Sequence, residues 1–129
     1  MPQKIKIIAE NVQVVAELND SSTAKSIISI IPIKTLAQRW GGEIYFSIPV
    51  TAGLESGSRE VLEAGELGFW PTGNAFCIFF GPTPASRGDE IRAASAVNII
   101  GKMKSDWSKL WDVSSGSSIV IKMAEDGKE

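Results

Sequence analysis

Residues 65–84 read GELGFWPTGNAFCIFFGPTP and contain four of the chain's five phenylalanines. The segments GELGFW and AFCIFF flank the residues PTGN, in which Pro71 and Gly73 are typical of a tight turn. Alternate side chains of a strand point to opposite faces, and all six residues of AFCIFF are apolar. The stretch therefore predicts a β-hairpin whose second strand is covered on both sides.

Further strands are predicted on either side of this hairpin. Residues 4–8 and 12–18 carry alternating apolar side chains around a short turn, which indicates an opening hairpin. The segments TLAQRW and EIYFSI flank the pair Gly41-Gly42, and two glycines tolerate the positive φ angles of a hairpin turn. Residues 96–103 and 117–123 also have the character of strands.

Two helices are predicted from apolar residues at helical spacing. The first follows the N-cap candidates 19–21, has its apolar positions within residues 24–31, and ends at Pro32. The second has Ser105 as its cap, and its apolar face consists of Met103, Trp107, Leu110 and Trp111.

The remaining segments are predicted to connect these elements. Residues 51–65 are expected to form a polar surface loop, with a short strand or a turn of helix in its second half, and residues 81–95 are expected to be irregular. About eight short strands with two helices favour a mainly β fold, namely a closed antiparallel barrel, because closure removes sheet edges. With 129 residues, of which 43% are hydrophobic, the chain is expected to form a single domain over residues 1–129.

Charge and composition argue against several classes of partner. The formal net charge is −2 and there is no long Lys/Arg run, so nucleic acid is not expected as a partner. No apolar stretch could span a bilayer and the first residues lack a signal-peptide pattern, so we expect a cytoplasmic protein with no membrane association. Cys77 is the only cysteine, and an internal disulfide is therefore impossible.

The chain contains no histidine, which limits its possible chemistry. A Ser-His-Asp or Cys-His nucleophile pair, an imidazole base and the usual zinc sites are all excluded. Carboxylate, lysine or arginine chemistry remains, as does catalysis by positioning alone. No residue spacing implies a metal or a cofactor.

Three segments resemble cyclophilins in their order along the chain: residues 65–69 (GELGF), 74–78 (NAFCI) and 98–103 (NIIGKM). The longer segments EIYFSIPV, GELGFWPTGNAFCIFFGPTP and ASAVNIIGK resemble a small microbial family of cyclophilin-like barrels of undetermined function, and this resemblance covers nearly the whole chain. The resemblance implies a cyclophilin-like barrel with a shallow site on its outer face.

Cyclophilins are peptidyl-prolyl isomerases, and the resemblance implies where their site would lie. Their catalytic arginine precedes a Pro-Gly turn by three residues, and with Gly41-Gly42 in place of that turn the matching residue is Gln38. Arg39 is one position away and lies on the opposite face unless a bulge redirects it. By the same alignment Glu43, Ile44, Phe46, Trp70, Cys77 and Val97 occupy the positions of other pocket residues.

Three hypotheses about function remain open. The first is a binding protein for a small molecule or a proline-containing peptide, with ligand-binding residues Gln38, Ile44, Phe46, Trp70 and Cys77 and with the segment GPTPASRG on the rim. The second is a peptidyl-prolyl isomerase with altered pocket residues, in which Arg39 is catalytic. The third is a structural or interaction protein without a concave site. The oligomeric state is not predicted.

Overall fold

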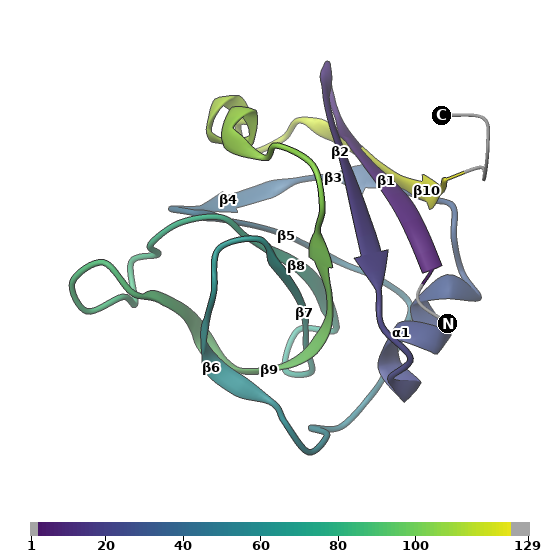
Figure 1. Ribbon diagram of the computed structural model, residues 1–129, viewed down its shortest axis with the longest axis horizontal. Coiled ribbons are helices and arrows are strands. Elements are labelled where there is room, and N and C mark those ends of the chain that lie inside the picture. Colours follow the sequence, from purple (N-terminus) through teal and green to yellow (C-terminus); the bar gives the residue numbers. More distant parts are fainter. Residues whose placement is uncertain (1–2, 125–129) are drawn as a thin grey trace.

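The computed structural model describes residues 3–124, which form a ten-stranded antiparallel sheet with one short α-helix and one 3-10 turn (Figure 1). The strands are β1 (Gln3–Ala9), β2 (Val12–Leu18), β3 (Ile33–Leu36), β4 (Gln38–Trp40), β5 (Glu43–Ser47), β6 (Arg59–Leu62), β7 (Glu66–Trp70), β8 (Ala75–Phe79), β9 (Ile91–Met103) and β10 (Ser118–Met123). Their order in the sheet is β3-β10-β1-β2-β9-β7-β8-β5-β4, and β6 pairs with β9. The mainly β class is confirmed, with ten strands rather than about eight.

All three predicted hairpins are present. β1 pairs with β2 from Ala9↔Val12 outward, β4 pairs with β5 around Gly41-Gly42, and β7 pairs with β8 from Trp70↔Ala75. Gly41 has a positive φ of 60°, as the turn requires. These contacts are local in sequence, which explains why the residue pattern was sufficient to find them.

The helices are shorter than predicted. α1 (Ser22–Ile28) ends before Ile31, and the side chain of Ser21 caps it by accepting a hydrogen bond from the Ala24 N–H at 3.2 Å. The second helix is only a 3-10 turn, η1 (Ser108–Asp112), and Ser105 does not cap it. The Ser105 hydroxyl instead accepts a hydrogen bond from the Val15 N–H on β2, at 2.9 Å. No helix among residues 3–124 is long and apolar enough to cross a membrane.

Two strands were not predicted in full. β9 begins at Ile91, inside the segment 81–95 that was expected to be irregular, because its first half pairs with β6. β3 pairs with β10 near the other end of the chain, and Ala37 separates it from β4. In both cases the strand depends on a partner that is distant in sequence, which a local residue pattern does not indicate.

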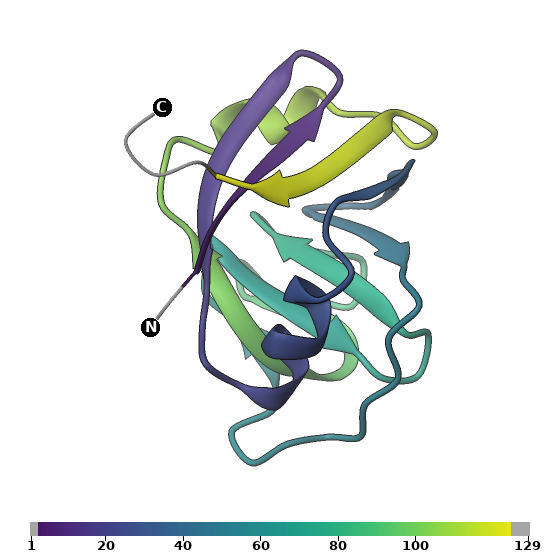
Figure 2. The same cartoon turned by 90° about the vertical axis from the view of Figure 1, so that its right-hand side faces the viewer.

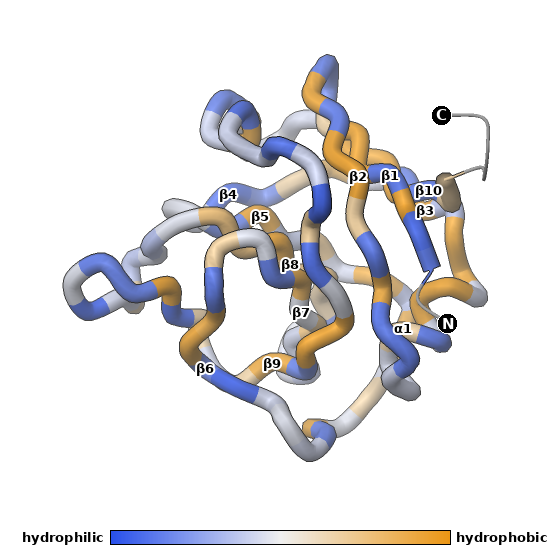
Figure 3. The backbone as a smooth tube through the Cα atoms, in the orientation of Figure 1, coloured by the Kyte–Doolittle hydropathy of each residue, from blue (hydrophilic) through white to orange (hydrophobic). Residues whose placement is uncertain are grey.

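The predicted two-sided burial of β8 is confirmed. Phe76 and Ile78 belong to the main core, which lies between α1 and the strands β1, β2, β5, β7, β9 and β10. Ala75, Cys77 and Phe79 face a second, smaller core beneath β6 and the first half of β9. The apolar colour of β8 among its neighbours is visible in Figure 3.

The segment 51–58 is attached to α1 and to the middle of β9. The Glu55 carboxylate accepts hydrogen bonds from the N–H and the hydroxyl of Thr23, at 3.1 and 2.9 Å. Asn98 accepts one from the Glu55 N–H and donates one to the Gly53 carbonyl. Residues 51–58 therefore lie at the end of the sheet where α1 is, away from the turn between β1 and β2 (Figure 2).

Glycine allows the turn between β4 and β5 to approach the segment after β8. The Gly42 N–H donates a hydrogen bond to the Pro82 carbonyl at 2.7 Å, and the Gly42 carbonyl accepts one from the Phe80 N–H at 2.8 Å. A Cβ atom on Gly42 would overlap the backbone of Gly81. A side chain at residue 42 would therefore force the two segments apart.

We expect Gly42→Ala to lower the free energy of unfolding by about 1–3 kcal/mol, measured by urea denaturation. The matched control is Gly53→Ala, because a Cβ atom at Gly53 meets nothing within 4 Å. The control should change stability by less than about 0.5 kcal/mol. Equal losses in the two variants would contradict the importance of this close approach.

Candidate functional site

A pocket of about 150 Å³ opens on the sheet face opposite the main core. Three aromatic side chains, one carboxyl, one thiol and three small apolar side chains line it: Trp40, Tyr45 and Trp70; Glu43; Cys77; and Ala93, Ala94 and Val97. They come from β4, β5, β7, β8 and β9. Ala94 is exposed at the edge, whereas Cys77 and Val97 are buried.

The alternation along β5 determines which side chains reach the pocket. Glu43 and Tyr45 face it, whereas Ile44 and Phe46 belong to the main core on the other face. Tyr45 lies directly opposite Cys77 on β8. The hairpin around Gly41-Gly42 thus presents Glu43 and Tyr45 to the site.

Trp70 is a fixed wall of the pocket. Its indole N–H donates a hydrogen bond to the Ser95 hydroxyl at 2.6 Å, which connects β7 to β9. A Cβ atom on Gly73 would lie 2.8 Å from the indole ring, so the glycine gives the ring room to pack against the turn. The ring is therefore held from both sides.

Glu43 is the most unusual residue of the site, because its side chain is a carboxyl that is only 5% exposed. Burial raises its pKa from the ordinary value near 4.5 to about 7, although a hydrogen bond from Cys77 lowers it in part. The ion pairs between described residues use other carboxylates. Glu43 therefore changes charge near neutral pH, without a cation of its own.

Cys77 is the neighbour of this carboxyl. Burial raises the pKa of the thiol well above its ordinary value, and the Glu43 charge raises it further. The thiol donates a hydrogen bond to the Ala75 carbonyl at 3.7 Å.

The structure brings some of the predicted site residues together and separates others. Trp70 and Cys77 line the pocket. Gln38 is exposed and lies opposite Tyr45, outside the lining. Ile44 and Phe46 are 0% and 2% exposed in the main core, so the structure places them on the other face of β5 from the one expected.

Six lining residues were not among the predicted ligand-binding residues: Trp40, Glu43, Tyr45, Ala93, Ala94 and Val97. Glu43 and Val97 occupy positions that the resemblance to cyclophilins assigns to the pocket, but they were not predicted to bind a ligand. One signal for Glu43 was available, since it is a carboxyl at the start of the apolar strand EIYFSI, immediately after the Gly-Gly turn. The alanines carry no such signal, because only the pairing of β9 brings them to the pocket.

The predicted rim segment is connected to the pocket through β9. The Thr83 hydroxyl donates a hydrogen bond to the Arg92 carbonyl, and the Ser86 hydroxyl accepts one from the Arg92 N–H at 3.2 Å. Ser86 also accepts one from the Thr83 N–H at 2.9 Å. These bonds hold the start of the strand that carries Ala93 and Ala94.

Comparisons with known proteins agree with the architecture. Residues 3–122 match the protein family described as Cyclophilin-like. The chain belongs to this cyclophilin-like family. It is also similar to the solution structure of the hypothetical protein AF2241 from Archaeoglobus fulgidus, with 38% sequence identity, a TM-score of 0.82 and coverage of 95% of each chain. No curated protein matches it.

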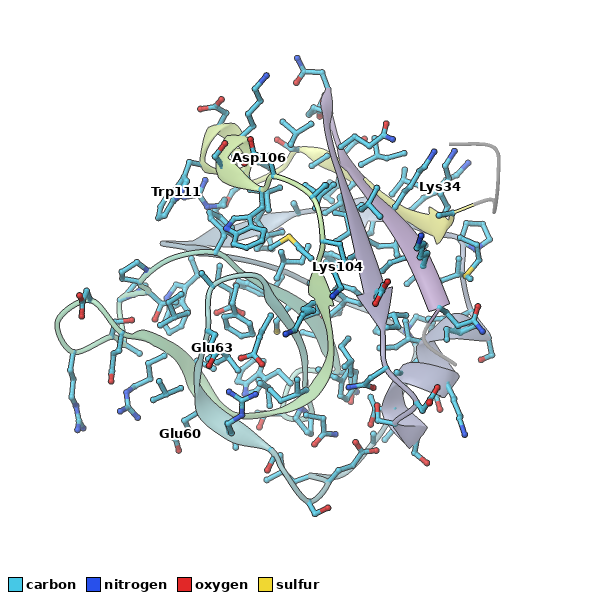
Figure 4. The ribbon with its side chains drawn as sticks, in the orientation of Figure 1. Lys34, Glu60, Glu63, Lys104, Asp106 and Trp111 are labelled. Atoms are coloured by element: carbon cyan, nitrogen blue, oxygen red, sulfur yellow. The ribbon has the colours of Figure 1, made fainter. Side chains whose placement is uncertain are left out.

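Arg39 is the residue that the isomerase hypothesis makes catalytic. Its side chain lies on the face of β4 that points away from the pocket. It lies opposite Ile44, and its guanidinium donates hydrogen bonds to the carbonyls of Gly41, Trp111 and Val113 at 2.6–3.2 Å. The guanidinium carbon is 5.3 and 5.5 Å from the ring centroids of Phe80 and Trp111. Trp111 lies within η1 and is 49% exposed (Figure 4), so Arg39 closes the sheet edge against this turn.

We expect the pH dependence of stability to reveal Glu43. Its pKa is higher in the folded than in the unfolded chain, so the folded state binds more protons between pH 4.5 and 7 and stability is lost as the pH rises. Between pH 5 and 8 the wild type should lose roughly 2–3 kcal/mol relative to Glu43→Gln, measured by urea denaturation at each pH. Parallel pH profiles of the two proteins would show that Glu43 titrates normally.

We expect no acceleration of prolyl isomerisation in a protease-coupled assay on a Xaa-Pro peptide, because Arg39 points away from the pocket. Arg39→Ala and Arg39→Lys are the matched variants. Acceleration by the wild type that disappears in both variants would contradict this expectation and restore the isomerase hypothesis.

Proposed function

We propose that this cyclophilin-like protein binds a small molecule, or a single side chain of a peptide, in the pocket between β5, β7, β8 and β9. The observation that carries the proposal is the carboxyl of Glu43 among three aromatic side chains. Binding sites for small molecules are typically apolar concave surfaces with a few polar groups that orient the ligand. The pocket has this composition.

The energetic cost of Glu43 supports a binding role. A carboxyl whose pKa is raised by burial destabilises the folded state relative to an apolar residue of similar size. An apolar residue at the same position would simply extend the second core formed by Cys77, Phe79 and Val97. A ligand that uses the carboxyl would offset this cost.

The size of the pocket limits the ligand. The pocket is small, with a volume of about 150 Å³. A compact molecule, or one side chain of a longer ligand, is the appropriate size. The fixed position of Trp70 favours a preformed site over one that opens on binding.

We also infer that the sheet closes into a barrel. Its end strands β3 and β4 are separated by Ala37 alone. The Ala37 N–H donates a hydrogen bond to the Ser117 carbonyl, and the Ala37 carbonyl accepts one from the Gly116 N–H, each at 2.8 Å. These bonds support one continuous segment from β3 to β4. Its first half pairs with β10, and its second half pairs with β5.

We expect the neutral probes phenol, cyclohexanol and tert-butanol to bind in the pocket with a Kd on the order of 1 mM. In ¹H–¹⁵N spectra they should shift the indole signals of Trp40 and Trp70 and the amide signals of Ala93 and Ala94 in a saturable way. Signals of the distant α1 residues should not move.

Matched tryptophan variants test the location. Ala94→Trp places a ring over the pocket edge and should weaken binding of all three probes at least tenfold. Ala64→Trp makes the same change at an exposed alanine in the turn before β7 and should have no effect. Absence of saturable shifts in the wild type would contradict the proposed function.

A further inference from the structure

The pocket is negatively charged when Glu43 is ionised, and its walls supply no cation. Its lining residues include no lysine or arginine. The neighbouring arginines are occupied elsewhere, since Arg39 donates to backbone carbonyls on the other face and Arg92 forms ion pairs with Glu60 and Glu90. The charge that would complement Glu43 is therefore absent from the lining.

The aromatic side chains favour a particular kind of cation. Trp40, Tyr45 and Trp70 come from three different strands and line one small cavity with the carboxyl. Aromatic rings attract cations through their quadrupole, and tryptophan does so most strongly. A cation with apolar substituents gains this attraction as well as hydrophobic contact with Ala93, whereas a strongly hydrated ion loses its water shell on entry.

We propose that the preferred ligand group of this pocket is a small methylated ammonium ion, which pairs with the Glu43 carboxylate inside the aromatic walls. The proposal rests on the proposed function, because it names the ligand class of the same pocket. A tetramethylammonium ion, with one nitrogen and four carbons, is compact enough for a cavity of about 150 Å³.

The proposal predicts a specific coupling between binding and protonation. A cation stabilises the ionised carboxyl, so binding releases a proton wherever free Glu43 is protonated. The other titratable groups at the site are the neutral thiol of Cys77 on β8 and the phenol of Tyr45 on β5, and the lining residues of β4, β7 and β9 do not titrate. Affinity for the cation therefore follows the ionisation of Glu43.

The experiment compares two probes with five non-hydrogen atoms, tetramethylammonium chloride and tert-butanol, by ¹H–¹⁵N titration of the full chain. Sodium chloride at the same ionic strength is the control for salt. At pH 8 we expect tetramethylammonium to bind at least tenfold more tightly than tert-butanol. Between pH 8 and pH 6 its affinity should fall about tenfold, because Glu43 has a pKa of about 7.

Glu43→Gln preserves the shape of the side chain and removes its charge. This variant should bind tetramethylammonium at least tenfold more weakly at pH 8, without pH dependence, and should bind tert-butanol within twofold of the wild type. The comparison of the two probes on the wild type needs no variant, so the test remains valid if the variant is unstable.

The outcomes separate the two proposals. Binding of tert-butanol without preference for tetramethylammonium would support the proposed function and overturn the ammonium inference. Tetramethylammonium binding that Glu43→Gln leaves unchanged would also overturn it. If neither probe shifts the pocket signals, both proposals fail.

Discussion

Burial of β8 on both faces is the constraint on which the rest of the structure depends. A strand whose side chains are all apolar must be covered on both faces, whereas a sheet with a single core covers only one face. The chain meets this requirement by folding β6 and the first half of β9 over Cys77 and Phe79. The second core, and with it the pocket, exists because this second layer is present.

The same arrangement explains the chemistry of the pocket. Phe79 is completely buried beneath this second layer, whereas Cys77 lines the cavity. Glu43 is two residues before Tyr45 on the adjoining strand, and the pleat of β5 directs both into that cavity. Burial without a cation then keeps the pKa of Glu43 near neutrality.

Arg39 shows that similarity in sequence does not ensure that a side chain reaches the same site. It lies within one residue of the position that the cyclophilin pattern assigns to an arginine, yet its side chain is on the opposite face of the strand. There it is placed near Phe80 and Trp111 and satisfies carbonyls at the end of η1. Membership of the cyclophilin-like family thus accounts for the architecture, whereas the residues that line the pocket differ from those of the cyclophilin pattern.

The sequence by itself determined the hairpins, the two-sided burial of residues 75–79 and the family, because these depend on local pattern and on turn residues such as Gly41-Gly42. The resemblance to cyclophilins also named Trp70 and Cys77, which line the pocket. Only the tertiary structure decided that Glu43, rather than Ile44, faces the pocket, and that Ala93 and Ala94 complete it. The reason is physical: the choice of face depends on strand register and on the pairing of β9 with β6, which connect residues distant in sequence.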